Sequence, residues 1–417
     1  MIRLILIVSL IHLAACSPKN EAPTGEQVNK IQIDSSAFAA QVGIVAYTSL
    51  SNASQTAQTF DSKLSSFMYH PNPMSQTEIQ QSWRLAYDSF LRSLIFSYLP
   101  IQDPPEWQSQ RIGYRHLLAQ VDSWPIEGGY IDYIQGYPFS GIVNDLTLNI
   151  DESSLRSQHG FTDPTNASLG YHALEFMLWG NNGKRSARDF FPQENTAPIP
   201  VNDAEVSTEP VEVSSNDASH NSANQSPEDS LNESTLIQVE AAEINPQNHN
   251  RRRQYTQLLI ELLQKDLHRI QRRWEPSSGY YAQLLQQSDS DNILRSAFIA
   301  AQGLISKEIL QKRFQLISSE FSQTSIDDIS ALISGLEHWF MPIEDDLQEA
   351  SLLFLLQQTD NQLATEFINA IKQLRTCLTT MSADDNSIDQ CKQDTIQLLA
   401  ILRKSANALR VNLPSLN

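Results

Sequence analysis

A histidine and a glutamate stand three residues apart in an apolar run that is bracketed by two glycines. They are His172 and Glu175, in the run from Gly170 to Gly180. On a helix, positions i and i+3 share a face, so both side chains could bind one metal ion or could pair with each other. The remaining residues of the run are mostly apolar, which predicts a helix that is buried nearly all round. Each polar group then needs a partner, because burying it alone is costly.

A metal site on this helix needs at least one more ligand from elsewhere in the chain. The candidates are His116, His159, His268, His338, Glu337 and Asp266. No spacing selects one of them. The chain has no HExxH motif, and HxxEH is excluded because Phe176 follows Glu175. It also has no GxSxG motif, no phosphate loop and no paired Glu-x-x-His units of the kind that di-iron bundles carry. It has no basic patch either, so the sequence does not indicate a nucleic-acid partner.

Several segments resemble the imelysin family, the insulin-cleaving membrane proteases. Gly-x-His-x-x-Glu followed by apolar residues and Trp-Gly is similar to the family signature. The supporting segments are Trp124-Pro125-Ile126 with Ile131-Asp132-Tyr133, the aromatic pair Trp83 and Tyr87, the helix with Tyr255 and Trp274, and Ser319 to Thr324. The likeness runs from about Ile33 to the C-terminus with one long interruption. It implies two bundle-like helical halves, and either iron uptake in the envelope or metallopeptidase activity.

The chain departs from the family pattern in the helix that carries Trp83. Imelysins often have a Thr-Glu pair there, whereas residues 89–94 contain no glutamate and Asp88 is the nearest acid. This removes a plausible carboxylate ligand. Asp132 and Glu127 could reach the His-x-x-Glu helix if their segment folds beside it, and helix capping is the alternative role for both.

The N-terminus resembles that of a bacterial lipoprotein. Residues 1–15 combine a short basic start with an apolar stretch too short to span a membrane, which indicates a signal peptide. The run Leu13-Ala14-Ala15-Cys16 resembles a lipobox, which implies cleavage before Cys16 and lipidation of its sulfur. Because Ser17 follows, we expect an anchor in the outer membrane that faces the periplasm. Residues 16–32 are then a lipidated tether.

The other two cysteines, Cys377 and Cys391, predict a disulfide. An exported chain meets oxidising conditions, and the polar residues between them are typical of a turn between two helices. We expect this bond to be structural.

The composition changes sharply between residues 193 and 250. This segment holds eleven acidic residues and no Lys or Arg. It therefore supplies eleven of the 19 net negative charges of the whole chain. Such composition predicts a disordered acidic insertion. Elsewhere helical periodicity dominates, over residues 37–67, 78–99, 108–123, 251–274, 293–320, 326–340, 345–358, 361–381 and 388–411. We therefore predict an all-α protein with helical bundles at 33–192 and 251–417.

Three functions remain open. The first is a lipid-anchored envelope protein that binds iron, zinc or copper through His172 and Glu175, or takes part in iron uptake, with the membrane and envelope proteins as partners. The second is a non-catalytic helical module in which the two residues form a buried structural pair. The third is a metallopeptidase, for which the sequence supplies only part of a catalytic motif and no catalytic residue that we can name.

Overall fold

The fold is all-α, as predicted. The computed structural model describes residues 34–99, 108–193, 248–342, 345–381 and 385–415. Within these ranges the β interaction is limited to a single bridge between Ile134 and Tyr137. The predicted signal peptide, Cys16, the tether and residues 194–247 of the predicted insertion lie outside the described residues. No helix among the described residues is both long and apolar enough to cross a membrane.

The described residues before the acidic segment form six α-helices and two 3₁₀ turns. They are α1 (Ser36–Tyr69), α2 (Pro73–Ser93), α3 (Gln108–Val121), α4 (Gly128–Ile131), α5 (Glu152–Gln158) and α6 (Tyr171–Trp179), with 3₁₀ turns η1 (Leu94–Tyr98) and η3 (Ala187–Phe190). The second part contains α7 (His249–Arg272), α8 (Tyr280–Gln287), α9 (Ser290–Gly303), the π-helix η4 (Leu304–Arg313), α10 (Ser325–Phe340), the 3₁₀ turn η5 (Asp345–Ala350), α11 (Leu352–Thr359), α12 (Asn361–Thr380) and α13 (Asp385–Ala408). The sequence analysis predicted neither the short helices α4, α5 and α8 nor the π-helix.

The hairpin of α1 and α2 is set by an apolar stripe and a capped start. α1 buries residues at helical spacing, among them Val42, Ala46, Leu50 and Ala53. The Asn72 side chain accepts hydrogen bonds from two backbone N–H groups of the first turn of α2, and Pro73 occupies the first helical position. These signals fix where α2 begins and so which of its faces turns toward α6.

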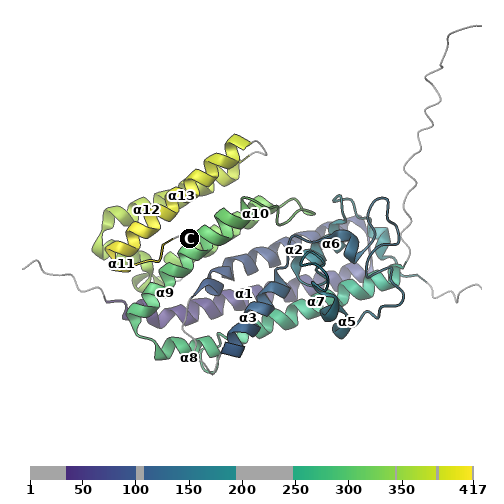
Figure 1. Cartoon of the computed structure of the whole chain (residues 1–417), viewed down its shortest axis with the longest axis horizontal. Helices are drawn as coiled ribbons and strands as arrows, with labels where there is room; N and C mark the ends of the chain where they lie inside the picture. Colours follow the sequence, from purple (N-terminus) through teal and green to yellow (C-terminus); the bar gives the residue numbers. More distant parts are fainter. Residues whose placement is uncertain (1–33, 100–107, 194–247, 343–344, 382–384, 416–417) are drawn as a thin grey trace, which may run out of the picture. The chain divides into compact units, whose positions relative to one another are not determined.

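The helices pack in two groups. α1 and α2 pack with α7 and α6, while α9, α10, α12 and α13 pack together (Figure 1). The groups join where α1 contacts α9 and where α2 contacts α10. By contacts, residues 34–417 form one compact unit. The sequence interpretation placed α7 in the C-terminal bundle, and this helix packs on α1, α3 and α6. The domain boundaries at 192 and 251 stay a prediction.

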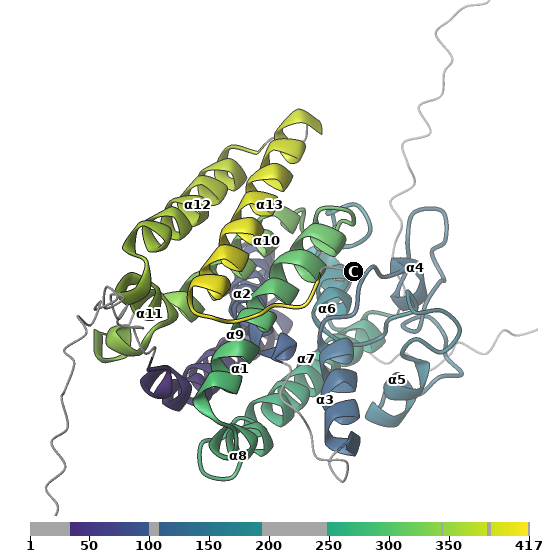
Figure 2. The same ribbon diagram turned by 60° about the vertical axis from the view of Figure 1, so that its left-hand side comes forward.

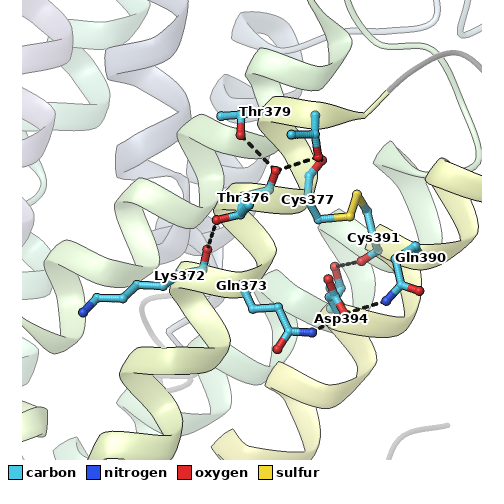
Figure 3. The surroundings of a disulfide bond; sticks show 10 residues. Lys372, Gln373, Thr376, Cys377, Thr379, Gln390, Cys391 and Asp394 are labelled. Atoms are coloured by element: carbon cyan, nitrogen blue, oxygen red, sulfur yellow. Dashed lines mark hydrogen bonds between the residues drawn. A yellow bond between two sulfur atoms is a disulfide. The ribbon is translucent and has the colours of Figure 1, made fainter.

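A disulfide joins the last two helices. Cys377 of α12 and Cys391 of α13 are bonded, with their Cα atoms 5.6 Å apart. α12 and α13 lie side by side in both views (Figures 1 and 2). Close by, Asp394 accepts hydrogen bonds from Gln373 and from Gln390, so a polar link crosses the same helix pair (Figure 3).

The two ends of the acidic segment are held together. Gln193 and Asn250 exchange two hydrogen bonds, Gln193 N–H to Asn250 Oδ1 at 3.0 Å and Asn250 Nδ2 to Gln193 O at 2.7 Å. α7 begins at His249, two residues before the predicted start of this helix at 251. The described residues on either side of the acidic segment therefore lie next to each other.

Candidate functional site

The helix with the His-x-x-Glu pair starts at a glycine that no other residue can replace without displacing backbone. Gly170 has φ +90°, and a Cβ there would lie 2.4 Å from the carbonyl oxygen of Gln120. From Tyr171 to Trp179 every residue of α6 is buried. The bracketing glycine thus lets α6 enter the core directly against the end of α3.

His172 and Glu175 pair with each other. The imidazole Nδ1 lies 2.7 Å from Glu175 Oε2, and the two side chains are almost completely buried. The other carboxylate oxygen, Oε1, accepts hydrogen bonds from the backbone N–H of Ser322 at 2.8 Å and from its hydroxyl at 2.7 Å. Both oxygens of Glu175 are therefore occupied by protein donors.

The second nitrogen of His172 faces α2 and the end of α3. Its Nε2 lies 3.0 Å from the Tyr87 hydroxyl and 3.4 Å from Asp122 Oδ1. The Tyr87 hydroxyl donates to the same oxygen of Asp122 at 2.8 Å. Around the imidazole lie the rings of Trp83 and Trp124, with centroids 6.3 and 6.4 Å from it. The imidazole thus has a hydrogen-bond partner at each nitrogen.

Arg313 links this pair to three buried or nearly buried carboxylates. Its guanidinium lies 3.0 Å from Asp122 Oδ2, 3.0 Å from Glu308 Oε1 and 3.4 Å from Asp328 Oδ2. It also donates to the Tyr87 hydroxyl at 3.0 Å. The π-helix explains the pairing with Glu308, because i→i+5 geometry brings residues five apart onto one face. Arg313, at the end of η4, is the centre of the network.

The pKa values of the buried groups in this network are set by burial and by the charged groups beside them. Burial opposes the charge of His172, but hydrogen bonds with Asp122 and Glu175 outweigh it and raise its pKa to about 9. Burial likewise disfavours the charge of Asp122, yet Arg313 and His172 hold its pKa well below the usual range. At Asp328, burial prevails over Arg313 and two serine hydroxyls and raises the pKa to about 6. At neutral pH His172 is therefore an imidazolium.

In this arrangement the residues do not fit a metal ion. An imidazolium has no lone pair to donate, and Glu175 already uses both oxygens. The guanidinium of Arg313 sits within 3.0 Å of Asp122, where it would repel a second cation. Among the residues that the structure describes, no group of three or more His, Cys, Asp or Glu side chains could hold an ion. The pair is a closed, hydrogen-bonded clamp.

Comparison with known proteins shows the family to which the chain belongs. The Imelysin family model matches residues 46–410, which is most of the chain. The protein is an imelysin. Its fold is similar to the crystal structure of a "putative iron-regulated protein A precursor" from Parabacteroides distasonis, with 11% identity, a TM-score of 0.58, and coverage of 90% of this chain and 97% of that chain. At that identity the likeness shows the fold alone. No protein of curated function matches the sequence.

The proposed third ligands of this imelysin have other surroundings. His116 Nε2 lies 3.1 Å from the Gln120 amide, and His159 accepts a hydrogen bond from the Ser168 N–H. Asp266 is paired with both terminal nitrogens of Arg156. Glu337 pairs with Arg375, and His268 is exposed. Within the described part of the chain, none of these side chains forms a hydrogen bond or an ion pair with His172 or Glu175.

Asp132 belongs to a second buried network of this imelysin. Its segment does fold beside α6, since a Cβ on Gly128 would lie 2.3 Å from the ring of Phe176. The carboxylate, however, turns to two arginines. Arg252 binds both of its oxygens, at 2.6 and 2.9 Å, and Arg185 binds one at 2.8 Å. Glu127 precedes α4 without a side-chain capping bond.

Sequence reasoning missed Asp122, Arg313 and Arg252 as members of these networks. The expected burial of the His-Glu pair indicated that other elements supply charged partners. This expectation did not identify those elements. Ser322 was closer to being found, since it lies in the Ser319 to Thr324 segment that resembles the family and bonds directly to Glu175.

Proposed function

We propose that this imelysin is an exported, lipid-anchored protein of the bacterial envelope that takes part in iron handling by binding and not by hydrolysis. The observation that carries the choice against hydrolysis is the closure of the His-x-x-Glu pair. Protein groups occupy both imidazole nitrogens and both carboxylate oxygens. A metallopeptidase needs a metal with an open position and a free general base, and this arrangement offers neither.

The iron association is supported by the likeness of the fold to the iron-regulated protein A precursor named above. The envelope location is supported by the lipoprotein-like N-terminus, whose cysteine is Cys16. Membrane lipid through that anchor, and envelope proteins, are the expected partners. A divalent ion such as iron, zinc or copper would then be handled elsewhere than at the clamp.

Elemental mass spectrometry on purified protein tests the proposal, with His172→Ala and Glu175→Ala alongside the wild type. We expect any bound iron, zinc or copper to be equal in the three proteins per folded molecule. Near-stoichiometric metal that is lost in both variants would refute the clamp and make the pair a metal site. The variants also report folding, because the clamp predicts a lower melting temperature for each.

Hydrolysis and anchoring have separate tests. We expect no cleavage of unfolded protein substrates by the purified protein, with or without a chelator; chelator-sensitive cleavage would restore the peptidase. We expect Cys16→Ser to move the protein from the membrane fraction to the soluble periplasmic fraction, and mass spectrometry of the wild-type N-terminus to find a lipidated cysteine.

A further inference from the structure

A polar groove lies between helices from the beginning and the end of the chain. It has a volume of about 830 Å³ and is lined by side chains of α1, α2, α10 and α12. The volume falls in the range of about 300–1,000 Å³ that is usual for small-molecule sites. None of its lining residues belongs to the His-x-x-Glu network. The groove is therefore a separate candidate site.

The close crossing of α2 and α10 forms one wall of the groove. At Gly335 an added Cβ would lie 2.3 Å from the backbone carbonyl oxygen of Arg92. The backbones of the two helices therefore touch here. Asp88 of α2 and His338 of α10, each about one turn from this contact, line the groove. This contact gives the groove a rigid side on which charged groups can be held in place.

Two ion pairs line the groove, so its charge is balanced. Arg92 Nε lies 2.7 Å from Asp88 Oδ2 on α2. Arg375 of α12 reaches Glu337 of α10 and also donates to the Ser334 hydroxyl at 3.0 Å. The groove thus offers both a cationic and an anionic group at each of two places.

Several polar groups of the groove are unused within the described part of the chain. The Nε of Arg375 is buried and has no acceptor. The side chains of Asn52, Gln55 and His338 line the groove, and no hydrogen bond or ion pair to them occurs among the described residues. The buried Nε–H of Arg375 is a donor that a polar ligand would satisfy, and the exposed amides of Asn52 and Gln55 are available to the same ligand.

We propose that this groove binds a small zwitterion that carries an ammonium and a carboxylate group, as a free amino acid or a short peptide with free termini does. Arg375 receives the carboxylate, since its free Nε–H makes a charge-assisted hydrogen bond possible. Asp88 or Glu337 receives the ammonium group. The amides of Asn52 and Gln55 pair with peptide groups. Among the described residues, no Phe, Tyr or Trp side chain lines the groove to stack on a sugar ring.

Affinity ultrafiltration tests the proposal on the full-length protein in detergent. One sample contains an equimolar mixture of the twenty amino acids, and a second contains an equimolar mixture of tripeptides with free termini. Mass spectrometry identifies what the protein retains. We expect retention from one of the mixtures, which decides between an amino acid and a peptide, and no retention of the same compounds once their termini are acetylated and amidated.

Arg375→Gln should lower this retention at least tenfold, and Arg115→Gln, on the exposed side of α3, should leave it unchanged. Asn52→Ala, at an exposed position of α1, gives a second variant if Arg375→Gln melts at a lower temperature than the wild type. Retention of nothing from either mixture would overturn the proposal. The proposal would also be overturned if the Arg375 and Asn52 variants retained as much as the wild type. It would likewise be overturned if the wild type retained the capped compounds as well as the uncapped ones.

Discussion

Replacing Glu175 by glutamine tests the clamp directly, because the change keeps the shape of the side chain and removes its charge. The glutamine oxygen can still accept from Ser322. Its NH₂ group then faces Nδ1 of His172, so the imidazole must give up the proton at that nitrogen. The pair would lose the charge that the wild-type structure maintains at neutral pH.

The size of the effect follows from the pKa of His172. The folded value of about 9 exceeds the reference value of 6.5. At about 1.4 kcal/mol per pKa unit, this difference stabilises the folded state by about 3 kcal/mol. Breaking a buried ion pair by removing one partner costs about 3–5 kcal/mol, which agrees. Because the folded pKa is raised, this stabilisation is fully present below pH 6.5 and is lost as the pH rises through 9.

We therefore expect Glu175→Gln to lower the free energy of unfolding by up to about 3 kcal/mol at pH 6, because Asp122 shares with Glu175 in raising the pKa of His172. The difference from the wild type should narrow as the pH rises past 9. Urea unfolding at pH 6, 7.5 and 9.5, followed by tryptophan fluorescence and circular dichroism, measures it. Trp83, whose ring centroid is 6.3 Å from that of His172, reports on the site itself.

Glu152→Gln is the matched control. Glu152 pairs with Arg156 and Lys265 but its side chain is 39% exposed, so its loss should cost less than about 1 kcal/mol at every pH. If Glu175→Gln costs no more than this control, or if its cost stays constant from pH 6 to 9.5, the pair is not a charged clamp and the reasoning fails.

Three further changes test other parts of the structure. Arg313→Met leaves buried carboxylates unpaired and should cost about 3–5 kcal/mol at pH 7; thermal melting should show partial recovery as the pH falls and Asp328 takes up a proton, because the pKa of Asp328 is already raised to about 6 with Arg313 present and rises further without it. Reduction of the disulfide, which spans 14 residues, should lower the free energy of unfolding by about 3 kcal/mol in the chain-entropy account, as urea titrations with and without dithiothreitol would show. Gly335→Ala should cost about 2 kcal/mol or more, because its methyl group meets a backbone oxygen 2.3 Å away; an unchanged melting temperature would contradict the α2–α10 contact.

The helices could be predicted because most of them are long and amphipathic. The stripe of Trp83, Tyr87 and Phe90 located α2, and capping at Asn72 then set its first residue earlier than the predicted start at 78. The π-helix could not be predicted, since its residues have the same composition as an α-helix and only the hydrogen-bond register differs. α8 is eight residues long and gave too short a periodic signal.

The site could be predicted in part. Spacing placed His172 and Glu175 on one face, and the expectation that both are buried and partnered was sufficient to require further charged groups. Asp122 lies fifty residues before His172 in the chain, and Arg313 follows 141 residues after it. Their contact depends on how α2, the end of α3, α6 and η4 pack together, and local sequence patterns do not predict that packing.

The clamp also explains how the fold accommodates the acidic segment. Glu175 and Ser322 are 147 positions apart, and residues 194–247 account for 54 of them. Lengthening this separation from 93 to 147 positions adds only about 0.4 kcal/mol to the entropy cost of closure, because that cost grows with the logarithm of loop length. A clamp that joins distant segments is thus compatible with a long insertion between them.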